Sequence, residues 1–111
     1  MEYLAGTGHT ILERNWRYGR YEIDIITLAE DGLHFVEVKS RNVPSAAAPE
    51  DNITAAKRRS LVLAAERFLH SASRKGLPGD IEIFFDVITV GFAGGGRELN
   101  YYPGAFTPIY V

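Results

Sequence analysis

The chain has 111 residues, of which 46% are hydrophobic and 23% are charged, and its formal net charge is −2. This length supports one hydrophobic core, so we expect a single domain over residues 1–111. The absence of cysteine excludes disulfides and thiolate chemistry, and the negative net charge is the wrong sign for a protein that coats nucleic acid nonspecifically. No apolar run reaches the length of a membrane span and no secretory signal is visible, so we expect a cytoplasmic protein with no membrane partner.

Hydrophobic periodicity and turn residues predict an α/β fold. In chain order we expect the end of a helix over 1–7, strands over 9–17, 21–28 and 33–38, a helix from Thr54 to about Ser71, and strands over 81–90 and 99–102. Thr54 is a good N-cap, and Pro103-Gly104 is expected to end the last strand. The core stripe of the long helix is Leu61, Ala64, Ala65, Phe68, Leu69 and Ala72. A helix between the third and fourth strands allows these to lie parallel, which predicts a mixed sheet flanked by helices.

Charged residues stand at alternate positions on both strands of the predicted central hairpin. They are Glu22, Asp24, Glu37 and Lys39. Because strand side chains alternate between faces, each of the two pairs shares one face. A loop over 29–32 puts Asp24 opposite Glu37, whereas a two-residue loop at Asp31-Gly32 puts Asp24 opposite Lys39, and Asp-Gly favours the second register. Either register keeps all these charges on one face.

Carboxylates that face each other among Leu, Ile, Val and Phe repel and are costly to bury. A divalent cation would relieve the repulsion, and carboxylate oxygens suit Mg²⁺ or Mn²⁺. The alternative is an edge hairpin whose charges point to solvent and pair with one another.

Several segments, in order along nearly the whole chain, resemble the YraN-like family of small bacterial proteins. They are 8–17, 21–26, 35–41, 53–59, 85–88 and 104–106. The resemblance implies a fold of the restriction-endonuclease-like superfamily, whose signature is Asp followed, after a gap, by Glu-x-Lys. By that resemblance Asp24, Glu37 and Lys39 would be the catalytic residues.

The chain departs from the family pattern at its start. The family opens with a longer helix that carries a Glu, whereas this chain starts about where that helix would end, so we expect a truncated first helix. In related junction resolvases an acidic residue of that helix completes the metal site. Tyr21 stands where the family has Gly, and the Ala- and Pro-rich segment 42–51 predicts a loop near the site. We therefore expect weak Mg²⁺ or Mn²⁺ binding, with no metal in this chain as the alternative.

Basic residues that could contact phosphates gather near the hairpin end and the helix start. They are Arg41, Lys57, Arg58 and Arg59. Cations in the first turns of a helix oppose the helix dipole, and the free N–H groups there bind anions. Lys57 precedes Leu61 by one turn and is expected to point toward the sheet. The alternative is that nearby acidic residues neutralise these cations and that they form separate solvated patches.

Asp86 interrupts an apolar run, and we expect a structural role in which it accepts hydrogen bonds from Arg14 or from backbone. His9, His34 and His70 show no metal-ligand spacing and are expected to be surface or satisfied residues.

Together these features predict a metal-dependent nuclease that cleaves phosphodiester bonds of DNA, or of a branched or single-stranded intermediate, with DNA favoured over RNA. Asp24 and Glu37 would hold the metal, Glu22 would either support a metal ligand or bind a second metal, and Lys39 would stabilise charge on the phosphate. Two alternatives stay open, a binding module without turnover and an interaction protein in an assembly. A monomer and a homodimer are both compatible with the sequence.

Overall fold

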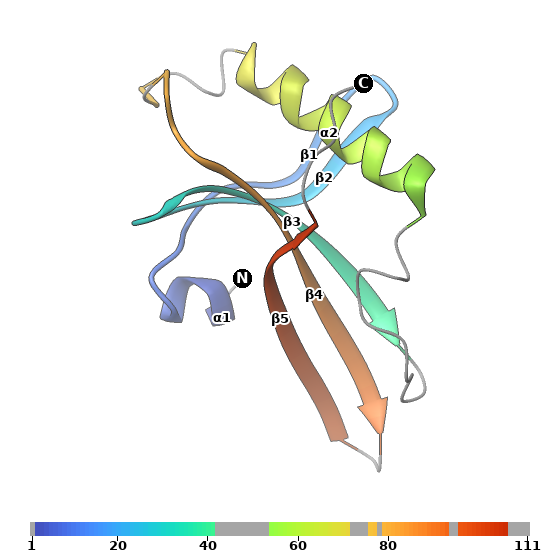
Figure 1. Ribbon diagram of the computed structural model, residues 1–111. Helices are drawn as coiled ribbons and strands as arrows, with labels where there is room; N and C mark the ends of the chain where they lie inside the picture. The colour runs from blue at the N-terminus through green and yellow to red at the C-terminus, as the bar shows by residue number, and fades with distance from the viewer. Residues whose placement is uncertain (1, 42–53, 72–75, 78, 94–95, 107–111) are drawn as a thin grey trace.

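The structure is a computed structural model that describes residues 2–41, 54–71, 76–77, 79–93 and 96–106. Its elements are α1 (Glu2–Gly6), β1 (Thr10–Tyr18), β2 (Tyr21–Ala29), β3 (Gly32–Arg41), α2 (Ala55–Leu69), β4 (Ile83–Ala93) and β5 (Gly96–Phe106) (Figure 1). The predicted element order is confirmed, including the short first helix. In this described part, neither helix has the length and apolar content needed to cross a bilayer.

The strands form one mixed sheet in the order β1-β2-β3-β4-β5. Strands β3 and β4 pair in parallel and all other neighbours are antiparallel, as the crossover through α2 requires. The predicted end of the last strand at Pro103-Gly104 is wrong, because β5 continues to Phe106. The pairing of β5 with β4 shifts register between Phe85 and Val87, which accommodates Pro103 and Gly104. Because β5 is an edge strand, it tolerates a proline that has no N–H to donate.

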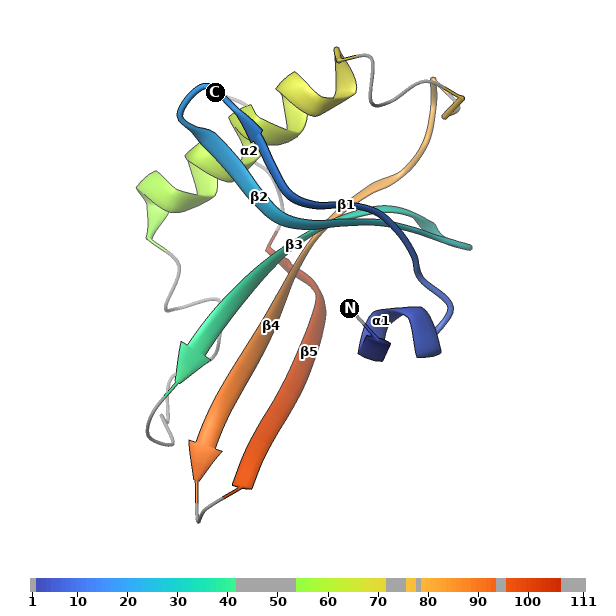
Figure 2. The same cartoon turned by 180° about the vertical axis from the view of Figure 1, so that it is seen from behind.

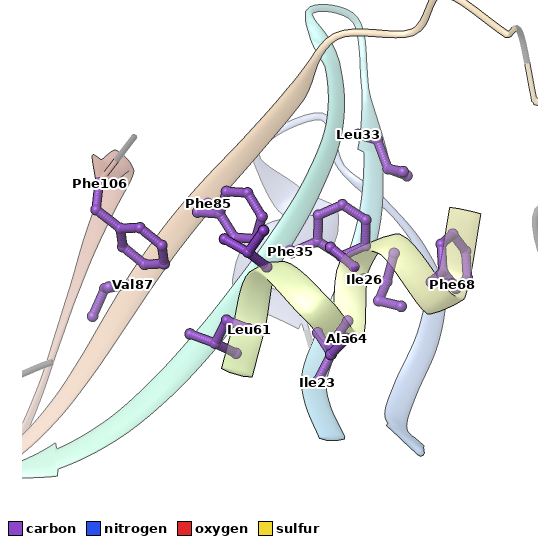
Figure 3. Packing of buried hydrophobic residues seen from close by; sticks show 12 residues of the cluster. Ile23, Ile26, Leu33, Phe35, Leu61, Ala64, Phe68, Phe85, Val87 and Phe106 are labelled. Atoms are coloured by element: carbon purple, nitrogen blue, oxygen red, sulfur yellow. The ribbon is translucent and has the colours of Figure 1, made fainter. Parts of the chain in front are cut away.

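Two hydrophobic clusters cover the two faces of the sheet. The larger one lies under α2, where Leu61, Ala64 and Phe68 pack against strand residues that include Phe35 and Phe85 (Figure 3). Most of the predicted helix stripe is therefore core, and Thr54 caps the helix as expected by accepting a hydrogen bond from the backbone N–H of Lys57 at 3.1 Å. Ala72 lies outside the described residues.

The smaller cluster lies on the opposite face of the sheet from α2. It is made of Leu4, Ile25, Val36 and Ile88, with Val38 packed against it. Leu4 belongs to α1, so the short first helix closes this face, and Figure 2 shows α1 on the side away from α2. The two clusters explain why the central strands carry apolar residues at consecutive positions.

Strand β2 changes face at Asp24. Ile23 packs in the cluster under α2, whereas Ile25 packs in the opposite cluster, and regular alternation would put both on one face. The partner strand is irregular at the same level, because Asn15 lies between the residues paired with Ile23 and Ile25 and has a φ of 50°. The bend carries the β1–β2 hairpin toward α2 (Figures 1 and 2).

The turn between β2 and β3 sets the register of the central hairpin. Ala29 pairs with Gly32 and Leu28 with Leu33, so the register favoured by an Asp31-Gly32 turn is wrong. The observed register is the alternative in which Asp24 lies opposite Glu37. Gly32 is the first residue of β3 and has a φ of 146°, which residues other than glycine rarely adopt. A Cβ there would lie 2.4 Å from the carbonyl oxygen of Glu82.

Replacement of Gly32 by alanine is predicted to lower the free energy of unfolding by about 2–4 kcal/mol, because the variant combines backbone strain with a clash against backbone. Chemical denaturation measures this. The matched control is Gly6→Ala, where a Cβ meets nothing within 4 Å. Equal stability of the two variants would contradict the tight approach of Gly32 to the Glu82 backbone, just before β4.

Candidate functional site

The two signature carboxylates lie where the hairpin strands part. Regular pairing of β2 with β3 runs from the turn to Ile25 and Val36. Beyond this pair a side chain joins the two strands, because Asp24 Oδ2 accepts a hydrogen bond from the backbone N–H of Val38 at 2.9 Å. This contact fixes the Asp24 side chain against the strand that carries Glu37.

Glu37 is a buried carboxylate with only 8% of its surface exposed. It lies on the face toward α2, whereas Val36 and Val38 pack on the other face, as strand alternation predicts. Burial raises the pKa of Glu37, and the charge of Asp24 raises it further. The Asp24 carboxylate is therefore close enough to oppose the ionisation of Glu37.

Two lysines offset part of this repulsion. Lys57 Nζ lies 3.6 Å from Glu37 Oε1, so the first turn of α2 delivers a cation to the sheet, as its position one turn before Leu61 predicts. The charges of Lys57 and Lys39 both act to lower the pKa of Glu37, but burial and Asp24 outweigh them. Lys39 thus belongs to the same electrostatic group as Asp24 and Glu37.

Glu22 lies apart from this group. Its Oε1 is 3.7 Å from an Arg17 guanidinium nitrogen, and its side chain is 44% exposed. The face change at Asp24 explains the separation, because Glu22 and Asp24 no longer share one face of β2. The expectation that all the hairpin charges lie on one face is therefore wrong for Glu22.

The donor set suits a hard divalent cation that keeps most of its water. Among the residues that the structure describes, no group of three or more His, Asp and Glu side chains is arranged to hold a metal. Asp24 and Glu37 offer two carboxylates, and Mg²⁺ is commonly bound by one or two carboxylates together with waters and substrate phosphates. A buried carboxylate with a raised pKa is the kind of group that such an ion stabilises in its charged form.

Two of the other predicted phosphate-binding residues, Arg58 and Arg59, contact different parts of the protein. The Arg58 guanidinium carbon lies 5.5 Å from the centre of the Phe106 ring, whereas Arg59 lines a hollow beside Arg20. Arg41 ends β3, and its side chain lies outside the described residues. Arg58 and Arg59 therefore have contacts that differ from those of Lys57, which contacts Glu37.

A second group of titratable side chains lies on the α1 side of the sheet. Asp86 is fully buried and accepts hydrogen bonds from Tyr101 at 2.5 Å and from the backbone N–H of Gly104 at 2.8 Å. His34 Nδ1 contacts the same carboxylate and its Nε2 contacts Asp31 at 2.7 Å. The expected backbone donor to Asp86 is confirmed, but Arg14 is not its partner among the hydrogen bonds of the described residues.

Sequence reasoning missed this network, although its signals were present. Asp86 interrupts an apolar strand, and His34 shares its strand face with Val36 of the smaller cluster. Burial acts to lower the pKa of His34, but its hydrogen bonds to Asp86 and Asp31 outweigh burial and raise it. Burial and the nearby His34 charge lower the pKa of His9, whose ring centre lies 4.7 Å from that of His34. Both ring nitrogens of His34 are engaged, so the arrangement is that of a structural network.

The fold and site define a class, a mixed α/β sheet protein in which a buried Glu faces a partly buried Asp across a hairpin. The sequence profile described as "Uncharacterised protein family UPF0102" matches residues 1–90. A UPF0102 protein of Bacteroides thetaiotaomicron is 35% identical over 96% of this chain and 84% of its own length. One of Nitratidesulfovibrio vulgaris is 38% identical over 93% of this chain and 74% of its own length. The chain belongs to the UPF0102 family, which confirms the YraN-like resemblance.

In metal-free buffer, Asp24→Asn is predicted to raise the melting temperature by a few degrees at neutral pH. The asparagine keeps an oxygen that accepts from Val38, while the repulsion of Glu37 disappears. Thermal unfolding with a chelator measures this. The control is Glu22→Gln, which removes an exposed carboxylate and should change the melting temperature little. A lower melting temperature for Asp24→Asn than for the control would contradict the repulsion.

The pKa of His34 is raised above its ordinary value of 6.5, so its stabilisation is complete below pH 6.5 and is lost as pH rises through the raised pKa. Asp31→Asn removes one charge that raises this pKa and should move the loss to lower pH. Stability curves between about pH 6 and pH 9 measure the shift. The control is Glu30→Gln in the same turn, which should leave the curve unchanged, and identical curves for both variants would contradict the coupling.

Proposed function

We propose that this protein is a divalent-metal-dependent nuclease that cleaves phosphodiester bonds of DNA, with Mg²⁺ or Mn²⁺ held by Asp24 and Glu37. The observation that carries the proposal is the buried Glu37 carboxylate, whose pKa is raised by burial and by the charge of Asp24. Such repulsion costs stability, and functional sites are where shifts of this kind concentrate. The YraN-like resemblance, with its Asp and Glu-x-Lys signature at these positions, supports the same residues.

The ion would supply an activated water and would neutralise charge on the scissile phosphate. Asp24 is held for this role by the backbone N–H of Val38, and Glu37 is held by burial between β3 and α2. Lys39 follows Glu37 on the same strand face, and its ammonium would stabilise the negative charge that develops on the phosphate. Lys57 offsets the Glu37 charge and would keep that carboxylate oriented.

The mixed sheet, with an antiparallel hairpin followed by a parallel strand, supports a restriction-endonuclease-like assignment. By that resemblance, branched and single-stranded DNA intermediates are among the candidate substrates. Because Glu22 pairs with Arg17, we propose it as a nearby carboxylate that does not bind the metal directly.

The first test is Mn²⁺ binding measured by isothermal calorimetry. The parent is expected to bind weakly, with a dissociation constant of about 1 mM, because only two carboxylates replace water on the ion. Asp24→Asn and Glu37→Gln should each abolish the heat, whereas the control Glu22→Gln should retain it. Equal heats for the parent and Asp24→Asn would exclude this metal site.

The second test separates metal binding from turnover. Lys39→Ala is predicted to bind Mn²⁺ like the parent, because an ammonium does not ligate a cation, and to lose cleavage of labelled branched DNA by at least about 100-fold. The control is Lys57→Ala, which should weaken cleavage less. Full cleavage by Lys39→Ala would remove its role, and metal binding by a parent that cleaves no DNA would favour the non-catalytic binding module.

A further inference from the structure

A hollow of about 380 Å³ lies between the β1–β2 turn and the outer side of α2. Its walls are Arg20 and Tyr21 from the turn and Ala56, Arg59, Ser60 and Leu63 from the helix. The volume is near the lower end of the range of about 300–1,000 Å³ for small-molecule sites. The β1–β2 hairpin bends toward α2 (Figures 1 and 2), so its turn contributes Arg20 and Tyr21 to the same hollow as the helix residues.

The charges in the hollow are all positive. It contains two guanidinium groups and no carboxylate, and neither guanidinium forms an ion pair among the described residues. Arg20 packs its guanidinium carbon 5.5 Å from the centre of the Tyr21 ring. A guanidinium stacked in this way keeps its N–H edge available for a bidentate contact with phosphate. The Ser60 hydroxyl adds a neutral donor.

Apolar surface adjoins this positive hollow. Within the described part of the chain, the large hydrophobic side chains that are exposed are Tyr18 at 54% and Leu63 at 41%. Leu63 lines the hollow, and Arg67, one turn further along α2, lies 5.9 Å from the Tyr18 ring centre. The Trp16 and Tyr18 rings are nearly parallel, and their centres lie 6.3 Å apart. An aromatic ring and arginines therefore share one continuous surface.

We propose that this surface, formed by Tyr18, Arg20, Arg59, Ser60 and Leu63, binds a single-stranded nucleic-acid segment. Arg20, Arg59 and Ser60 hold a backbone phosphate, and Tyr18 provides a platform on which a base stacks. Aromatic platforms beside a positive groove are the combination that single-strand binding uses, whereas a purely electrostatic site needs no exposed ring. The concentration of cations here also explains how a chain with a net charge of −2 attracts a polyanion.

The position of this surface specifies the substrate of the proposed nuclease, and this part of the inference rests on that proposed function. Tyr21 precedes Asp24 by three residues on β2, which is about 10 Å of extended strand. That distance corresponds to about three nucleotides of one DNA strand. The substrate would therefore carry a single-stranded tail of at least a few nucleotides beside the bond that is cleaved.

The test is fluorescence anisotropy with a labelled single-stranded DNA of about 12 nucleotides, in buffer with a chelator so that metal binding plays no part. Arg20→Ala/Arg59→Ala is expected to weaken binding at least tenfold and to reduce the log–log salt slope by about 0.7, the value for one phosphate of a single strand. The matched control is Arg14→Ala/Arg17→Ala, which removes the same charge from exposed positions of the same hairpin and should change affinity less than threefold.

The base-stacking role has a separate pair of variants. Tyr18→Ala is expected to weaken binding by about 5-fold to 100-fold, whereas Tyr18→Phe keeps the ring and should bind like the parent. Both variants replace the same exposed side chain, so thermal unfolding of each variant should match the parent.

Equal loss of affinity in the two double-arginine variants would overturn the proposal, because net charge alone would then explain binding. Tighter binding of polyglutamate than of DNA, lost in Arg20→Ala/Arg59→Ala, would assign the surface to an acidic protein instead. Mn²⁺ titration of Arg20→Ala/Arg59→Ala should equal that of the parent, so failure of this surface and failure of the metal site are distinguished.

Discussion

The repulsion between two neighbouring carboxylates is the constraint on which the rest of this structure depends. Glu37 is buried at the point where β2 and β3 part, and Asp24 raises its pKa from the facing strand. The surroundings hold the pair together rather than letting it separate. Val38 donates its backbone N–H to Asp24, and α2 supplies Lys57 to Glu37. A fold selected for stability alone would place an apolar pair here, so the arrangement indicates a function.

Helix α2 links this pair to the rest of the molecule. Its buried side forms the larger core, and its first turn brings Lys57 to Glu37. Its outer side carries Arg59 and Leu63 to the hairpin tip, which reaches the helix because both strands bend near Asp24. The same irregularity therefore separates Glu22 from the carboxylate pair and brings Arg20 to the hollow. On the other face, the fully buried Asp86 is satisfied by His34, Tyr101 and Gly104, which makes that face structural.

The sequence was sufficient to predict features that depend on local chemistry. The order of elements, the Thr54 cap, the parallel pairing across the helix and the opposite faces of Glu37 and Val38 all follow from periodicity and short-range contacts. It was insufficient where tertiary contacts decide. The predicted Asp31-Gly32 turn does not form, because Gly32 begins β3 and packs against the Glu82 backbone. Regular alternation fails at Asp24, where Ile23 and Ile25 pack in opposite hydrophobic clusters. Asp86 was marked by its place in an apolar strand, but its partners His34 and Tyr101 are distant in sequence, so local patterns could not pair them with it.

The most direct test of the central claim is the pKa of the Glu37 carboxyl group. NMR of its carboxyl carbon during a pH titration, with and without Mg²⁺, measures this pKa. We predict a pKa above the ordinary value of 4.5 in metal-free buffer and a decrease when Mg²⁺ is present, because the ion favours the charged carboxylate. The decrease should be absent in Asp24→Asn. A Glu37 pKa that does not respond to Mg²⁺ would contradict the account.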